Sequence, residues 1–334
     1  MLQAAPPLPA TATPGLTPRW LGALAKVVAV AAFVVVVAGS AVTSTRSGDA
    51  DPDWPLFEGR PLPSPSKMAV DRGKFYEHGH RVAAASLGIL TLVLAGCLQT
   101  RSESRRWVKA LGVAAGVTVV LLAVLGGIRV LTKDLRVVPI IHVAVAMPFL
   151  GICTALAVVT ARRWWAAAAE LQRSKGCPVE DARALAWTSL ATAIALYVQA
   201  VLGAIPRHLY EGALPHILGA FAVSTLAILL AARILSKHSG IGSVFRPGMG
   251  LLGLIVAQFF LGFSTYVVRP AGPKAPGSGF YEALASTHLA VGALLLVVAV
   301  VLSTRSFRIW GLAAEQAQVS SASTEIALER GGES

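Results

Sequence analysis

The sequence predicts an all-α membrane protein with eight transmembrane helices, arranged as two pseudo-symmetric four-helix bundles in a parallel repeat. Composition is the first observation behind this prediction. Of the 334 residues, 55% are hydrophobic and only 14% are charged, whereas about a quarter of the residues in a soluble domain are charged. Mean hydropathy is +0.66. The apolar residues also form long blocks rather than amphipathic patterns, and a histidine recurs on alternate blocks.

Eight stretches of the chain have the length needed to cross a bilayer, about 20 largely apolar residues. The predicted spans are 22–43, 77–98, 108–130, 138–160, 185–205, 214–235, 247–268 and 283–304. The first span ends in small residues, as a secretory signal does. Its apolar run is longer than such a signal contains, so we expect a retained helix.

Lys and Arg gather in the connections on one side of these spans, which predicts that both termini face the cytoplasm of a cell inner (plasma) membrane. The richer connections are 101–109, 161–177, 232–237 and 303–308, although the opposite loop 44–76 also holds several basic residues. The net charge of +12 is explained by these flanks and indicates no nucleic-acid partner.

The expected organisation follows from the spans. It comprises a cytoplasmic tail (1–21), a first four-helix half (22–160), a cytoplasmic linker (161–184), a second half (185–306) and a cytoplasmic C-terminal tail (307–334). The compositions of 1–18 and 311–334 predict mobile segments. None of the three cysteines falls in an external segment, so no extracellular disulfide is expected.

The histidines and glycines of the spans repeat. Near the outer ends of the even-numbered spans lie His80, His142, His216 and His288, and the odd-numbered spans close on Gly39, Gly126, Gly203 and Gly262. A repeat of four spans gives two halves of one orientation. The glycines either allow close helix packing or leave room for a flat ligand, and the sequence leaves both readings open.

Four histidines at one depth favour a cofactor site. Ionisable residues inside a span are costly and usually face the bundle interior. A single histidine is explained by a hydrogen bond to a carbonyl, but four at matched depth indicate metal ligands. We expect two pairs, His80 with His142 and His216 with His288. Zinc needs three or four clustered ligands, whereas haem needs axial histidines between apolar walls.

The two halves differ in their acidic residues. Glu77 lies one helical turn before His80, on the same helix face, while Ala213, Leu214 and Pro215 occupy the matching place before His216. Glu77 is therefore the candidate for chemistry, with a favourable interaction with the helix dipole as the simpler alternative.

Other polar residues near the sites receive smaller roles. Arg81 and Arg129 either pair with haem propionates or extend to the membrane interface. A helix rotates about 100° per residue, so His78 should point away from His80 and lie at the interface. His208 is a candidate for the edge of a haem, and His238 is given no role.

These residues resemble the haem A synthase family. The resemblance rests on EHGHR (77–81) opening the second span, on histidines in spans four, six and eight, and on PDWPL (52–56) in the first external loop. The segments LLAVLGGIRV and AVLGAIPRH resemble the ends of the family's third and fifth spans. The resemblance covers residues 20–306, which is all of the chain except its tails.

The resemblance implies an intramembrane oxidoreductase that oxidises the C8 methyl of haem O to a formyl group by successive hydroxylations. It implies that His216 and His288 ligate a resident haem b, while His80 and His142 hold the substrate haem O beside an essential Glu77. Molecular oxygen or water would supply the oxygen atom. Implied partners are a haem O synthase, an electron donor and the cytochrome oxidase assembly machinery, with membrane lipid around the chain and a homo-oligomer left open.

One departure from the family concerns the first external loop. Many members carry a cysteine pair there, and Asp51 and Phe57 stand at the expected positions. Two alternative functions are also compatible with the pattern. A di-haem electron-transfer cytochrome explains four histidines but gives Glu77 no task, and a transporter with a histidine proton relay predicts a protein without haem.

Overall fold

The computed structural model describes residues 17–100, 103–132, 135–174, 176–270 and 278–331. Within these ranges the chain is all helical and contains no strand. Eight of the helices are long and apolar enough to cross a membrane. They are α1 (Arg19–Ser44), α3 (Arg72–Gln99), α4 (Arg106–Thr132), α5 (Val137–Val159), α8 (Val179–Leu209), α9 (Ala213–Lys237), α10 (Gly242–Val267) and α11 (Gly279–Gly331). The predicted fold class and the eight spans are confirmed.

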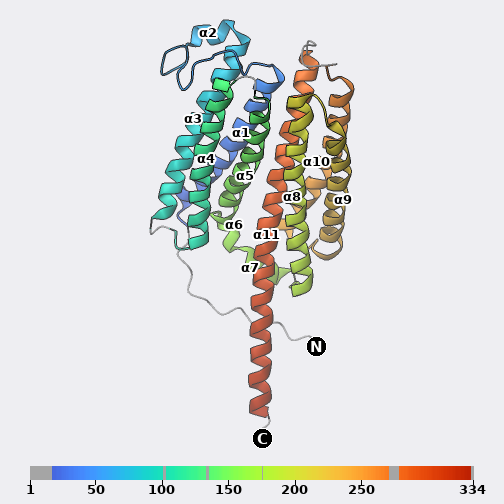
Figure 1. The fold of residues 1–334 in the computed structure, drawn as a ribbon. Helices are drawn as coiled ribbons and strands as arrows, with labels where there is room; N and C mark the ends of the chain where they lie inside the picture. The colour runs from blue at the N-terminus through green and yellow to red at the C-terminus, as the bar shows by residue number, and fades with distance from the viewer. Residues whose placement is uncertain (1–16, 101–102, 133–134, 175, 271–277, 332–334) are drawn as a thin grey trace.

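The spanning helices form two groups, one of α1, α3, α4 and α5 and the other of α8, α9, α10 and α11 (Figure 1). Within the first group α1 packs on α3 and α5, and α4 packs between α3 and α5. The second group repeats this pattern, since α8 packs on α9 and α11, and α10 packs between α9 and α11. The groups meet where α5 contacts α8 and α11 and where α1 contacts α11. Pseudo-symmetry between the halves remains a prediction.

Each group of helices has its own apolar core. Leu94, Leu98, Leu150 and Leu156 are fully buried in the first group, and Leu185, Leu230, Leu251 and Leu302 in the second. Large apolar side chains such as Val30, Ile89 and Phe260 are instead exposed on the outer surface. Exposure of this kind suits a surface that faces lipid, where backbone polar groups are satisfied within each helix.

In the described part of the chain, three short helices lie outside the spans: α2 (Pro65–Val70) in the loop before α3, and α6 (Arg162–Trp165) with α7 (Ala167–Arg173) between α5 and α8. The segment before α3, which includes α2, marks one end of the bundle, called here the α2 end (Figure 1). The second, fourth, sixth and eighth spans begin at this end; they are α3, α5, α9 and α11. The opposite end carries α6 and α7, the start of α1 and the extension of α11.

Three helices begin five or six residues before their predicted spans, namely α3 at Arg72, α8 at Val179 and α10 at Gly242, and α11 ends well beyond its span. The helix α3 begins at Arg72, ahead of its apolar run, because the Asp71 carboxylate accepts a hydrogen bond from the Lys74 N–H at 3.1 Å and caps it. The expected mobile segment from residue 311 is helical as far as Gly331. This stretch has no proline and holds good helix formers, and its first turn buries Leu312 and Ala313. Residues 1–16 and 332–334 lie outside the described residues.

Candidate functional site

All four recurring histidines lie in the part of their helices nearest the α2 end: His80 on α3, His142 on α5, His216 on α9 and His288 on α11. Each is half-buried. The described residues contain no group of three or more His, Cys, Asp and Glu side chains that could hold a metal ion. The histidines of the described chain therefore have to be considered as pairs.

The two histidines of the second half, His216 and His288, lie close to each other. The rings of His216 and His288 have their centroids 6.2 Å apart, with the ring planes 87° to each other. An imidazole nitrogen binds a metal at about 2 Å, and the ring centre lies about 1 Å further on, so two axial imidazoles have centroids about 6 Å apart. The observed separation fits one metal ion between the two rings.

The backbone of α8 fixes the protonation of His216. Its Nδ1 lies 3.2 Å from the carbonyl oxygen of Gln199. A carbonyl only accepts, so Nδ1 carries the proton and donates it, which leaves the lone pair on Nε2. Such a hydrogen bond to the distal nitrogen is the usual support of a metal-binding histidine. In return, the Gln199 side chain donates to the carbonyl of His216 at 2.8 Å.

Glycine lies against the histidine in three of the four cases. A Cβ at Gly39 would come within 3.0 Å of His80 Cε1, one at Gly203 within 2.8 Å of His216 Cε1, and one at Gly262 within 2.9 Å of His288 Cε1. The missing side chains thus make space for imidazole rings, a role that the sequence did not indicate. Gly126 does not follow the pattern, since a Cβ there would meet nothing within 4 Å.

The residue four positions before each of these glycines completes the arrangement. Val35, Gln199 and Gln258 supply the backbone carbonyls that interact with His80, His216 and His288. Of these three carbonyls, that of Gln199 forms a hydrogen bond of normal geometry, whereas the Nδ1 atoms of His80 and His288 are buried without a hydrogen-bond partner among the described residues. Sequence reasoning missed both glutamines, although QAVLG (199–203) and QFFLG (258–262) repeat at the same depth.

In the first half, His80 and His142 lie close enough for their charges to interact. Glu77 is 3% exposed, and its carboxylate is held from two sides. Its Oε2 accepts from the Asp51 N–H at 2.9 Å, and its Oε1 accepts from the Arg81 guanidinium one turn further along α3. The second half has no such carboxylate beside its histidines in the described residues, as the sequence indicated.

Arg81 and Arg129 both contact the loop between α1 and α3. Arg81 donates to the carbonyls of Asp53 and Asp51 at 2.6 and 2.7 Å, and Arg129 forms an ion pair with Asp49 at 3.0 Å. Each arginine therefore already has an acceptor in the protein. Arg81 in particular orients Glu77 and the loop together.

His78 is not the interfacial side chain that its helical position suggested. It is fully buried, and its Nε2 lies 2.9 Å from Asp51 Oδ2, with neither side chain exposed. The ring of Phe57 packs edge-on against it, with centroids 5.0 Å apart. The sequence-based interpretation failed because the loop folds back over this face of α3. Asp51 and Phe57, the two residues at the family's cysteine positions, both contact His78.

Asp51 also organises the rest of this loop. Its carboxylate accepts from the N–H groups of Asp53 at 3.0 Å and Glu58 at 3.2 Å, in addition to its contact with His78. Its own N–H donates to Glu77. One buried side chain and its backbone therefore connect the loop to the candidate catalytic carboxylate.

Arg207 on α8 is a further candidate that sequence reasoning missed. Its guanidinium donates to the Ser40 carbonyl at 3.0 Å and to Ser44 Oγ at 2.6 Å, both on α1. Within the described residues it forms no ion pair with a carboxylate, although its charge reaches His288. A partly buried cation without an anion is a costly arrangement that an anionic ligand would relieve. His208 lies next to Arg207, and His238 lies at the far end of α9.

Taken together, the fold and the site define a multi-pass all-α membrane protein with paired histidines near one end of its helices. The COX15-CtaA family model, described as cytochrome oxidase assembly protein, matches residues 22–215. This is more than half of the chain, which therefore belongs to that family, the haem A synthase family that its motifs resemble. A search of curated proteins finds no match. The family match ends one residue before His216, so the second histidine pair is supported by geometry.

Proposed function

We propose that this protein is a haem A synthase, which oxidises the C8 methyl of haem O to a formyl group by successive hydroxylations. The family's described role in cytochrome oxidase assembly supports an activity that supplies a haem for that oxidase. The observation that carries the proposal is the pair of facing imidazoles, His216 and His288, with centroids 6.2 Å apart. A second histidine pair beside a held carboxylate supplies a separate place for the substrate.

The second half would hold a resident haem b. His216 and His288 would hold the haem iron, and the Nδ1–H of His216, which donates to the Gln199 carbonyl, keeps its Nε2 available for that role. Gly203 and Gly262 leave the space in which the two rings sit. Arg207, which has no carboxylate partner in the described residues, is the residue we assign to a propionate. A haem bound here would supply electron transfer.

The first half would hold the substrate haem O between His80 and His142. Glu77 stands one turn from His80, and its carboxylate is fixed by the Asp51 N–H and by Arg81. A fixed carboxylate beside a reacting methyl can accept and return a proton, or can stabilise positive charge that develops on the carbon. The absence of a matching acid in the second half supports oxidation in the first half alone.

The test is to purify the protein from cells that make haem O and to extract and separate its haems. We expect haem b together with haem O and its oxidised products. Protein without haem would contradict the proposal. Haem b alone, unchanged when haem O and oxygen are supplied, would favour an electron-transfer cytochrome, and the oxygen source is identified by supplying labelled oxygen or labelled water.

A further inference from the structure

A cavity lies at the end of the bundle opposite the histidines. It has a volume of about 520 Å³ and is bounded by the segment leading into α4, by α6 and by α11. Its lining consists of Arg105, Trp107, Trp164, Trp165, Thr304, Phe307, Arg308 and Gly311. No histidine lines it, so it is separate from the proposed haem sites. It lies between the first group of helices and α11, the last helix of the second group.

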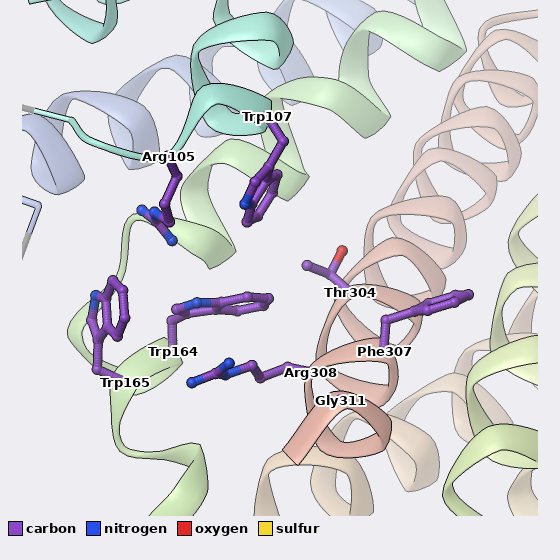
Figure 2. A pocket seen from close by; sticks show the side chains of 8 residues that line it. All are labelled: Arg105, Trp107, Trp164, Trp165, Thr304, Phe307, Arg308 and Gly311. Carbon is purple, nitrogen blue, oxygen red and sulfur yellow. The ribbon is translucent and has the colours of Figure 1, made fainter. Parts of the chain in front are cut away.

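The cavity combines two guanidinium groups with indole rings (Figure 2). The Arg105 guanidinium carbon lies 5.0 Å from the Trp165 ring centroid, and that of Arg308 lies 5.5 Å from the Trp164 centroid. In Figure 2 both guanidinium groups end on the side where Trp164 and Trp165 lie. Stacking on indoles orients guanidinium groups and leaves their N–H edges available for an anion.

The two arginines differ in their partners. Arg105 donates to both oxygens of Glu103 at 2.8 Å, and so its charge is compensated within the protein. Arg308 forms no hydrogen bond or ion pair within the described residues, and its Nε is buried without a partner. Glu315, further along α11, influences Arg308 only through its charge. A half-buried guanidinium without an acceptor among the described residues is suited to binding an anionic ligand.

We propose that this cavity binds the headgroup of an anionic phospholipid, whose phosphate accepts hydrogen bonds from Arg308. The guanidinium fork matches phosphate oxygens. Tryptophan favours the interface between lipid and water, and basic pockets between membrane helices are suited to anionic headgroups. Trp107 is 46% exposed and offers an apolar wall for the first part of an acyl chain. A lipid seated here would contact α4, α6 and α11 at once and would stabilise the junction of the two halves.

The experiment measures thermal unfolding of the full-length, delipidated protein in mild detergent. Phosphatidylglycerol, phosphatidylcholine with the same acyl chains, and inorganic phosphate are added separately. We expect phosphatidylglycerol to raise the unfolding temperature more than phosphatidylcholine does, and inorganic phosphate alone to have no comparable effect. Equal shifts with the two lipids would overturn the proposal, and an equal shift with phosphate would assign the site to a free anion instead.

The variant Arg308→Gln tests whether the stabilisation by phosphatidylglycerol arises at this cavity. A basic residue contributes about 1 kcal/mol to anionic-lipid binding, so the apparent affinity for phosphatidylglycerol should fall about fivefold. The matched control is Arg246→Gln, an exposed arginine on α10 at the same end but outside the cavity, which should keep the wild-type preference. An unchanged preference in Arg308→Gln would refute the assignment. If that variant does not fold, native mass spectrometry of the wild-type protein tests the proposal instead, by identifying the lipid that stays bound when both lipids are supplied. Retained phosphatidylcholine in place of phosphatidylglycerol would contradict the proposal.

Discussion

At the scale of single residues, the site is built from histidines whose surroundings are fixed by their neighbours' backbones. His216 donates to the Gln199 carbonyl at 3.2 Å, and its ring lies against Gly203, which has no side chain to displace it. An imidazole that is both oriented and restricted to one tautomer loses little freedom when it binds a metal. The geometry around each ring is therefore as important to the site as the histidine itself.

Replacing Gly203 with alanine should expel the resident haem. The new Cβ would lie 2.8 Å from His216 Cε1, so the ring has to leave the position from which it faces His288. Gly126→Ala is the matched control, because its Cβ meets nothing within 4 Å. Alanine favours a helix over glycine by about 1 kcal/mol, so neither variant should unfold for lack of helix propensity. Extracted haem b measures the effect, and equal haem content in the two variants would contradict this account.

The variant Glu77→Gln should retain bound haem and stop formyl formation. The amide keeps the size of the side chain and still accepts from the Asp51 N–H, but it cannot take up a proton or stabilise positive charge. Extracted haems separated by chromatography provide the measurement. The control is Glu211→Gln, an exposed carboxylate at the same end of the bundle, which should leave product unchanged. Normal haem A output from Glu77→Gln would remove this carboxylate from the mechanism.

At the scale of elements, the loop between α1 and α3 is the part that the sequence described least well. Asp51 and His78 form a fully buried pair, and the backbone N–H of Asp51 donates a hydrogen bond to the Glu77 carboxylate. The helical position of His78 indicated that it points away from His80. It did not indicate that a loop would cover that face, since loop packing depends on contacts between residues distant in the chain.

Asp51→Ala should release this loop. It leaves the buried His78 ring without its hydrogen-bond partner, and an unsatisfied buried polar group costs about 1–3 kcal/mol. Hydrogen exchange of residues 51–58 and thermal unfolding measure the release. Asp49→Ala is the control, because the Asp49 side chain is 50% exposed in its pair with Arg129 and such a pair is worth at most about 1 kcal/mol. Equal protection of the loop in both variants would show that Asp51 does not hold it.

We expect the thermal stability of the protein to depend on pH through Glu103, in the connection between α3 and α4. Glu103 is 1% exposed, and its hydrogen bonds with Arg105 and Thr17 lower its pKa from 4.5 to about 2 despite burial. A carboxylate with a depressed pKa stabilises the fold above its unfolded pKa, and the stabilisation is lost as pH falls from about 4.5 toward 2. Wild type should therefore lose thermal stability over this range. Glu103→Gln should be less stable at pH 7, and the difference should narrow on acidification; a constant difference would contradict this assignment.

At the scale of the whole molecule, each half holds its own histidine pair, and each of the two apolar cores is built mainly from the helices of one half. His216→Ala should therefore lose haem b while the first half still binds added haem O, and His80→Ala should do the reverse. Absorption spectra and extracted haem content distinguish these outcomes. Loss of both haems from either variant, with the protein still folded, would show that the two sites are not independent.

The sequence by itself determined the fold class, the eight spans and the depth of the histidines, because these depend on local hydropathy and on position along a helix. The ends of the helices lie within six residues of the predicted span boundaries, apart from the helical extension of α11. The Glu77–His80 spacing and the absence of an acid before His216 were also readable, since both are relations within one helix.

Only the tertiary structure decided which atoms meet between helices. It brought His216 to His288, set Gly203 against an imidazole, buried His78 against Asp51, and left Arg207 and Arg308 without carboxylate partners among the described residues. Such contacts depend on how helices rotate and pack against one another, and on where loops return. Repeats and periodicity in a chain define the face of a helix, whereas packing between helices determines what that face meets.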